Sequence, residues 1–202
     1  MGLLSGSITG RRFHVLGTMP DAYRELLQDR LTAHAFREPP AASAKQGEPV
    51  EGWCRVQNLL RTDFEEPDTW LFDKYVVFCL RVDVKKLPTR LLTATVEIKC
   101  DAWKKERGVE RVPSAVKKEI RENIEVDWLG RVFPTVKTVE IVWNVLDGWA
   151  IVATQSDALL DRVKKRFHRS FGFDLIQASP LDVLSADQQA GMLALTPFTL
   201  RE

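Results

Sequence analysis

The chain has 202 residues, with 29 lysines and arginines against 28 aspartates and glutamates, and 45% of its residues are hydrophobic. This composition is typical of a globular protein with one large domain or two small ones. No run of 18 apolar residues occurs, and the N-terminal segment lacks a basic start followed by an apolar core. We therefore expect no membrane span, no secretory signal and a cytoplasmic location.

The predicted elements begin with a strand over residues 7–16, in which Phe13 and Val15 alternate with polar side chains. A helix follows from Thr18, whose hydroxyl can cap its first turn. Residues of one apolar stripe should pack this helix on a sheet: Tyr23, Leu26, Leu27, Leu31 and Ala35.

The next segment alternates between turn formers and strand formers. Three prolines and few large apolar groups make residues 38–51 a loop. β-Branched and aromatic residues then predict strands over 53–60 and within 69–84. Residues 74–84 alternate strictly, so this strand should have one wetter face.

Two helices are predicted after the strand that ends at Leu87-Pro88. The first would bury one face and end at Gly108 in a left-handed conformation, with the inward residues Leu91, Thr95, Ile98 and Ala102. The second begins near Pro113-Ser114 and would turn inward Val116, Ile120, Ile124 and Trp128.

A β-hairpin and a last helix complete the pattern. Residues 135–146 and 149–153 are strand-like and flank Asp147-Gly148, a strong signal for a two-residue turn. Ser156 can cap a helix that ends at Gly172 and buries Leu160, Val163, Phe167 and Phe171. Its other side carries Arg162, Lys164, Lys165, Arg166 and Arg169, and a short strand is expected over 173–177.

This order of elements predicts an α+β fold with largely antiparallel sheets and amphipathic helices packed on one face. We divide it into a strand-helix-strand region over 1–87, a region of helical pair, hairpin and final helix over 88–184, and a tail over 185–202.

Sequence motifs for chemistry are missing. The cysteines and histidines are dispersed, at Cys54, Cys79, Cys100, His14, His34 and His168. Their spacing fits neither a disulfide framework nor a metal site, so we expect buried thiols. Glycine-rich phosphate loops and hydrolase nucleophile motifs are also absent, and we therefore expect no enzyme activity, catalytic residue or cofactor. An acidic cluster over 63–68 leaves a Mg²⁺-dependent nuclease as a weaker alternative.

Charge is distributed unevenly along the chain. Residues 85–131 carry 12 basic and 8 acidic side chains, whereas the segments on either side are slightly acidic. A cationic surface that tracks a phosphate backbone is therefore predicted on the two central helices, made by Lys99, Lys104, Lys105, Arg107, Lys117, Lys118, Arg121 and Arg131. The alternative is that these are ordinary solvated helix faces, partly paired with neighbouring glutamates, and the basic side of the final helix presents the same choice.

The segment Val132-Phe133 places an apolar pair on a turn just before a strand. A core position is one interpretation. An exposed phenylalanine would instead indicate a self-association contact, because such a patch is costly unless a partner covers it.

The succession of motifs resembles the RdgC family of recombination-associated, DNA-binding proteins. The likeness spans residues 5–184 and rests on Gly52-Trp53, Leu87-Pro88, Leu129-Gly130-Arg131-Val132-Phe133, Trp143, Asp147-Gly148 and the helix from Ala158 to Phe171. The resemblance implies a non-enzymatic, nucleoid-associated homodimer that encircles duplex DNA with little sequence preference. It also implies an indirect action on the strand-exchange recombinase through that DNA.

The family pattern further assigns Arg131 and Phe133 to a dimer contact and the DNA surface. Family members continue for a domain-sized stretch where this chain has only its tail, which leaves an open clamp, a single-contact dimer and a monomer as alternatives. A second alternative is a protein interaction module without DNA binding, using the apolar tail residues Met192, Leu193, Leu195, Phe198 and Leu200.

Overall fold

The computed structural model describes residues 2–3, 6–40, 45–179, 182, 184, 185, 187, 188 and 191. The apolar tail residues named above lie outside this set. The elements, in chain order, are β1 (Arg11–Leu16), α1 (Tyr23–Ala33), β2 (Pro49–Cys54), the short 3-10 helix η2 (Pro67–Thr69), β3 (Leu71–Phe72), β4 (Tyr75–Val84), α2 (Thr89–Arg107), α3 (Ser114–Arg131), β5 (Thr135–Asn144), β6 (Trp149–Val152), α4 (Asp157–Phe171) and β7 (Asp174–Gln177).

One antiparallel sheet of seven strands organises the fold. The strand order is β2-β4-β5-β6-β1-β7, and β3 pairs with β4 beside this path. The longest pairing joins β4 to β5 over ten residues each, from Tyr75 opposite Asn144 to Val84 opposite Thr135. The predicted α+β class is confirmed, and strands from both sides of residue 87 share this single sheet.

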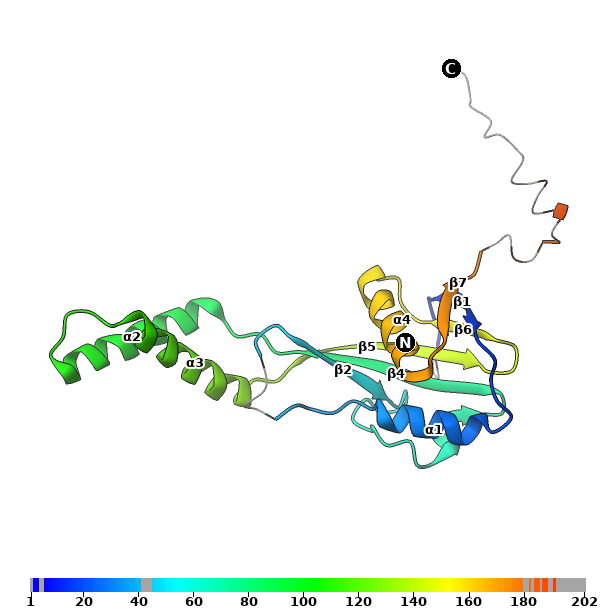
Figure 1. Cartoon of the computed structure of the whole chain (residues 1–202), viewed down its shortest axis with the longest axis horizontal. Coiled ribbons are helices and arrows are strands. Elements are labelled where there is room, and N and C mark those ends of the chain that lie inside the picture. Colours follow the sequence, from blue (N-terminus) through cyan, green and yellow to red (C-terminus); the bar gives the residue numbers. More distant parts are fainter. Residues whose placement is uncertain are drawn as a thin grey trace, which may run out of the picture.

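Helices α1 and α4 cover one face of the sheet and contact each other (Figure 1). Leu27 and Leu31 of α1 and Phe167 of α4 pack against the strands in the main core. Aromatic rings fill its centre: the Trp53 ring meets Phe78 edge-on at 5.0 Å, and Trp143 meets Phe167 at 4.9 Å. Such rings bury the largest apolar areas of any side chain, so this cluster stabilises the placement of both helices.

The face of β4 predicted to be wetter is mostly buried. Val77 and Cys79 are both covered, and Arg81 pairs with Asp83 at 2.6 Å while its guanidinium lies 4.1 Å over the Phe36 ring. The reason is tertiary: β4 is an inner strand between β2 and β5, and the segments at Phe36 and Leu59 lie over its second face, where both contact Arg81.

Strand β2 begins at Pro49, four residues before the predicted strand. The segment after α1 runs along it, because the Phe36 amide donates to the Trp53 carbonyl at 2.8 Å and the Trp53 amide donates to His34 at 3.0 Å. Gly52 permits this contact, since a Cβ there would lie 2.3 Å from the Cα of Phe36. Pairing with the segment after α1 therefore determines where this strand begins, and alternation in the sequence alone did not predict that start.

Helices α2 and α3 form a hairpin that projects from the end of the β4–β5 pair, and we call α2, α3 and their connecting turn the arm (Figure 1). The arm has a small core of its own, composed of Leu92, Val96, Cys100, Val112, Ile120, Ile124 and Trp128. The face predicted for α2 is wrong, because Leu91 and Ile98 are exposed. The buried stripe lies one residue further along, at Leu92, Val96 and Cys100, and it packs against α3 instead of the sheet.

Capping of α4 follows the sequence prediction, since the Ser156 hydroxyl accepts from the amide of Leu159 and Gly172 ends the helix with a φ of 78°. We expect Ser156→Ala to lower the free energy of unfolding by about 1 kcal/mol, because it leaves a helix N–H without its acceptor. Urea denaturation measures this loss. Ser156→Asp should restore it, and an unchanged midpoint in Ser156→Ala would show that the cap contributes nothing.

Candidate nucleic-acid interface

The basic residues predicted to contact DNA all lie on the arm. Most of them are exposed, because the arm stands clear of the sheet and its own core is confined to the seam between α2 and α3. The arm is inserted between two strands that pair directly, so its two ends leave the sheet side by side at Val84 and Thr135. A cationic element is therefore held out in solvent from the paired ends of β4 and β5.

Two hollows flank the apolar seam of the arm, and four of the eight predicted basic residues line them. Lys117, Lys118 and Arg121 line one of them together with Glu97. Lys99 lines the other, beside the carboxylates of Glu106 and Asp127. The structure therefore brings three of the four basic residues of α3 together and places Lys99 on a different side of the arm.

Intrahelical ion pairs engage half of the eight predicted residues. The N–O separations are 2.7 Å for Lys104–Asp101, 3.6 Å for Lys118–Glu122, 2.8 Å for Arg121–Glu125 and 2.7 Å for Arg131–Asp127. The hydrogen bond between Lys104 and Asp101 raises the pKa of the lysine and lowers that of the aspartate. Exposed pairs of this kind contribute little stability, so the cations remain available to a stronger anionic partner.

The other four residues form no ion pair with the described part of the chain: Lys99, Lys105, Arg107 and Lys117. Arg107 instead lies 4.9 Å over the ring of Trp103. Lys117 is exposed beside Lys118 at the start of α3. These two lysines are adjacent exposed charges on the arm.

The elbow between α3 and β5 presents the apolar pair to solvent. Val132 is half-buried and its amide donates to the Trp128 carbonyl at 2.9 Å, which closes the helix. Phe133 is 93% exposed, so a core role for its ring is ruled out. Arg131 sits one turn from Asp127, to which it is paired.

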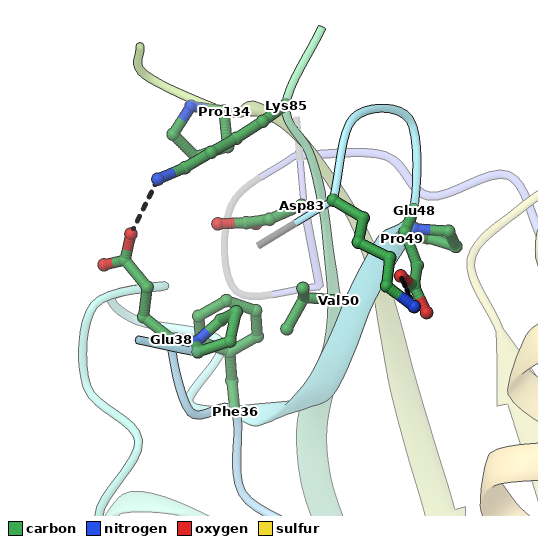
Figure 2. A pocket seen from close by; sticks show the side chains of 10 residues that line it. Phe36, Glu38, Glu48, Pro49, Val50, Asp83, Lys85 and Pro134 are labelled. Atoms are coloured by element: carbon green, nitrogen blue, oxygen red, sulfur yellow. Dashed lines mark hydrogen bonds and ion pairs between the residues drawn. The ribbon is translucent and has the colours of Figure 1, made fainter. Parts of the chain in front are cut away.

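A cavity of about 310 Å³ lies where the arm joins the sheet (Figure 2). Lys85 links its two sides, because its Nζ lies 3.3 Å from Glu38 and donates to the Leu129 carbonyl at 3.1 Å. The Asp83 carboxylate in the same cavity is held by Arg81. These contacts fasten the base of the arm to the body, and each carboxylate there already faces a cation.

In the acidic cluster over 63–68, carboxylates also already face a cation of the chain. The buried guanidinium of Arg55 bonds the Asp63 carboxylate and lies 3.6 Å from Glu66. Within the described residues, no group of three or more His, Cys, Asp or Glu side chains is placed to hold a metal ion.

Sequence patterns missed a second basic cluster, which packing of α1 on α4 creates. Arg166 donates to the His34 carbonyl at this junction, and burial, followed by the charges of Arg166, Arg169 and Arg30, lowers the pKa of the His34 ring. The spacing of Arg166 and Arg169 on one helix was visible in the sequence, but their convergence with α1 was not.

The model of a protein family described as "Putative exonuclease, RdgC" matches residues 17–192 of the chain. A search of curated proteins found no match to the chain. In the described part of the chain, no helix has the length and apolar character needed to cross a membrane.

Proposed function

This chain belongs to the recombination-associated RdgC family, and from that premise we propose that it binds duplex DNA through the phosphate backbone. On that DNA it restrains the strand-exchange recombinase by occupying the duplex that the recombinase needs. The protein then acts in the nucleoid, without catalysis and without reading base sequence.

The observation that carries this proposal is the arm. It projects a helical hairpin from the sheet and carries exposed lysines and arginines on α2 and α3. Lysine side chains are long and flexible, and their contacts to phosphate do not depend on the base sequence. Both properties suit nonspecific binding. Release of the ions that DNA condenses around itself supplies the driving force.

The exposed ring of Phe133 supports a homodimer. A phenylalanine with 93% of its surface in water is a candidate anchor for a second copy, and aromatic anchors dominate binding at protein interfaces. Val132 lies beside it and extends the apolar patch. The two cationic arms of such a dimer would then approach DNA together.

The family description names an exonuclease, which makes nuclease activity the competing function. The carboxylates over 63–68 are the candidate metal ligands, but Arg55 engages two of them. A cation already bound to these oxygens competes with Mg²⁺, and this favours the non-catalytic proposal.

Salt titration of duplex binding tests the proposed function. We expect the observed affinity to fall linearly with salt on logarithmic axes, with a slope of roughly −0.9 for each phosphate contacted, and to be equal for unrelated sequences. Fluorescence anisotropy of labelled duplexes measures both. Binding that ignores salt would contradict the proposal, and Mg²⁺-dependent shortening of the duplex that Asp63→Ala abolishes would establish the nuclease instead.

A further inference from the structure

A second cationic site lies away from the arm, where the C-terminal end of α1 meets α4. The Arg166 guanidinium donates to the His34 carbonyl, Arg30 of α1 lies one turn before His34, and Arg169 lies one turn after Arg166 in α4. All three charges act on the His34 ring. Arg30 belongs to the last turn of α1, and the other two follow each other by three residues on α4. Two helices far apart in sequence therefore bring three like charges to one place.

Arg166 is the unusual member of this cluster. Its Nη2 donates to the His34 carbonyl at 3.0 Å, while its buried Nε has no hydrogen-bond partner in the described part of the chain. Burial lowers the pKa of this guanidinium, Glu51 opposes that effect and Arg169 adds to it. An unpartnered, partly desolvated arginine donor is costly unless a strong acceptor completes it.

The cluster retains a net positive charge after its neighbours are considered. Glu51 is the carboxylate that acts on Arg166, and it is paired with Arg162 at 3.2 Å. Each helix C-terminus carries about half a negative charge, so the two ends together offset roughly one of the three guanidinium charges. About two positive charges therefore remain to attract an anion.

We propose that Arg30, Arg166 and Arg169 form a phosphate-binding site at the α1–α4 junction, which receives one phosphodiester group of the bound duplex. The guanidinium fork matches phosphate oxygens geometrically, and Arg30 and Arg169 are exposed enough to reach them. The proposal rests on the proposed function, and it adds a contact on the body to those of the arm.

Charge removal at the exposed pair tests the site. Arg30→Gln with Arg169→Gln leaves the partly buried Arg166 and its bond to His34 in place, so the fold should persist, and an unchanged Tm checks this. We expect the salt slope to become shallower by about 0.9 and the affinity near 0.1 M salt to fall roughly eightfold, as for the loss of one phosphate contact. The matched control, Arg12→Gln with Arg24→Gln, removes two exposed charges elsewhere and should change the slope little.

His34 provides a readout that does not depend on affinity. Burial and the three arginines lower its pKa. A bound phosphate offsets those charges, so the His34 pKa measured by NMR should rise when a short duplex is added. In the double variant the pKa of the free protein should already be higher, and the duplex should raise it less.

The outcomes separate this inference from the proposed function. Absence of duplex binding by the unmodified chain would overturn both. Salt-dependent binding with an unchanged slope in Arg30→Gln with Arg169→Gln would overturn the phosphate site alone. A His34 pKa that rises with inorganic sulfate but not with the duplex would identify a free-anion site and overturn the assignment to DNA.

Discussion

Replacing Lys117 and Lys118 together by glutamate is expected to lower the affinity for duplex DNA about 60-fold near 0.1 M salt. Each lost phosphate contact removes roughly 0.9 decade of affinity at that salt concentration, and two are lost. Both lysines are exposed on the first turns of α3, and only Lys118 has an acidic partner in the described chain, Glu122 at 3.6 Å. The salt slope should become shallower by about 1.8, equally for unrelated sequences.

Two further double variants make this experiment specific. Arg24→Glu with Lys45→Glu reverses two exposed charges on the body and controls for net charge alone. Lys99→Glu with Lys105→Glu reverses two charges of α2, where Lys99 lines the other hollow of the arm. A larger loss in the α2 variant would place DNA on that side instead. Equal losses in all three variants would contradict a role for any particular face of the arm.

Phe133→Ala is expected to weaken self-association about 30-fold while leaving the monomer folded. The ring is 93% exposed, so its removal creates no cavity in the described structure. An aromatic anchor at an interface contributes about 2 kcal/mol or more, which corresponds to that change in the dissociation constant. Sedimentation equilibrium measures the constant, and thermal unfolding of the dilute monomer checks the fold.

A matched control for Phe133 lies on the arm itself. Ile98 is a large apolar side chain with 69% of its surface exposed, and Ile98→Ala removes comparable surface away from the elbow. We expect Ile98→Ala to dimerise like the unmodified chain. If the mass of Phe133→Ala in solution equals that of the unmodified chain across the concentration range, the elbow is not the dimer contact. The DNA affinity of Phe133→Ala should fall only at protein concentrations at which its dimer has dissociated.

Local patterns predicted most elements of the body. Alternation placed Phe13 and Val15 inward in β1, and helical spacing identified the apolar stripe of α4. The hairpin was also predicted, but its turn is longer than the two residues expected. The strands end where Asn144 lies opposite Trp149, and hydrogen bonds between the Asn144 side chain and Asp147 hold the loop between them. These features depend on neighbours within a few residues, which a sequence window contains.

Packing between distant segments accounts for the features that patterns missed. In α2, two adjacent stripes are both partly apolar, and only contact with Ile120 and Ile124 of α3 selects the one that is buried. Likewise, the early start of β2 depends on pairing with the segment at Phe36. Neither choice is encoded in the local period of the residues concerned.

By itself, the sequence determined the α+β class, the family, and the concentration of basic residues between positions 85 and 131. The tertiary structure decided how those charges are placed: it put Lys99 on a different side of the arm from Lys117, Lys118 and Arg121, and it exposed Phe133. It also paired half of the eight predicted residues with carboxylates. It also packed α1 on α4, which brought Arg166 to the His34 carbonyl and the charges of Arg30 and Arg169 close enough to act on His34. Composition and period are properties of the chain, whereas the direction in which a charge faces depends on which helices pack together, and that is settled by apolar contacts far apart in sequence.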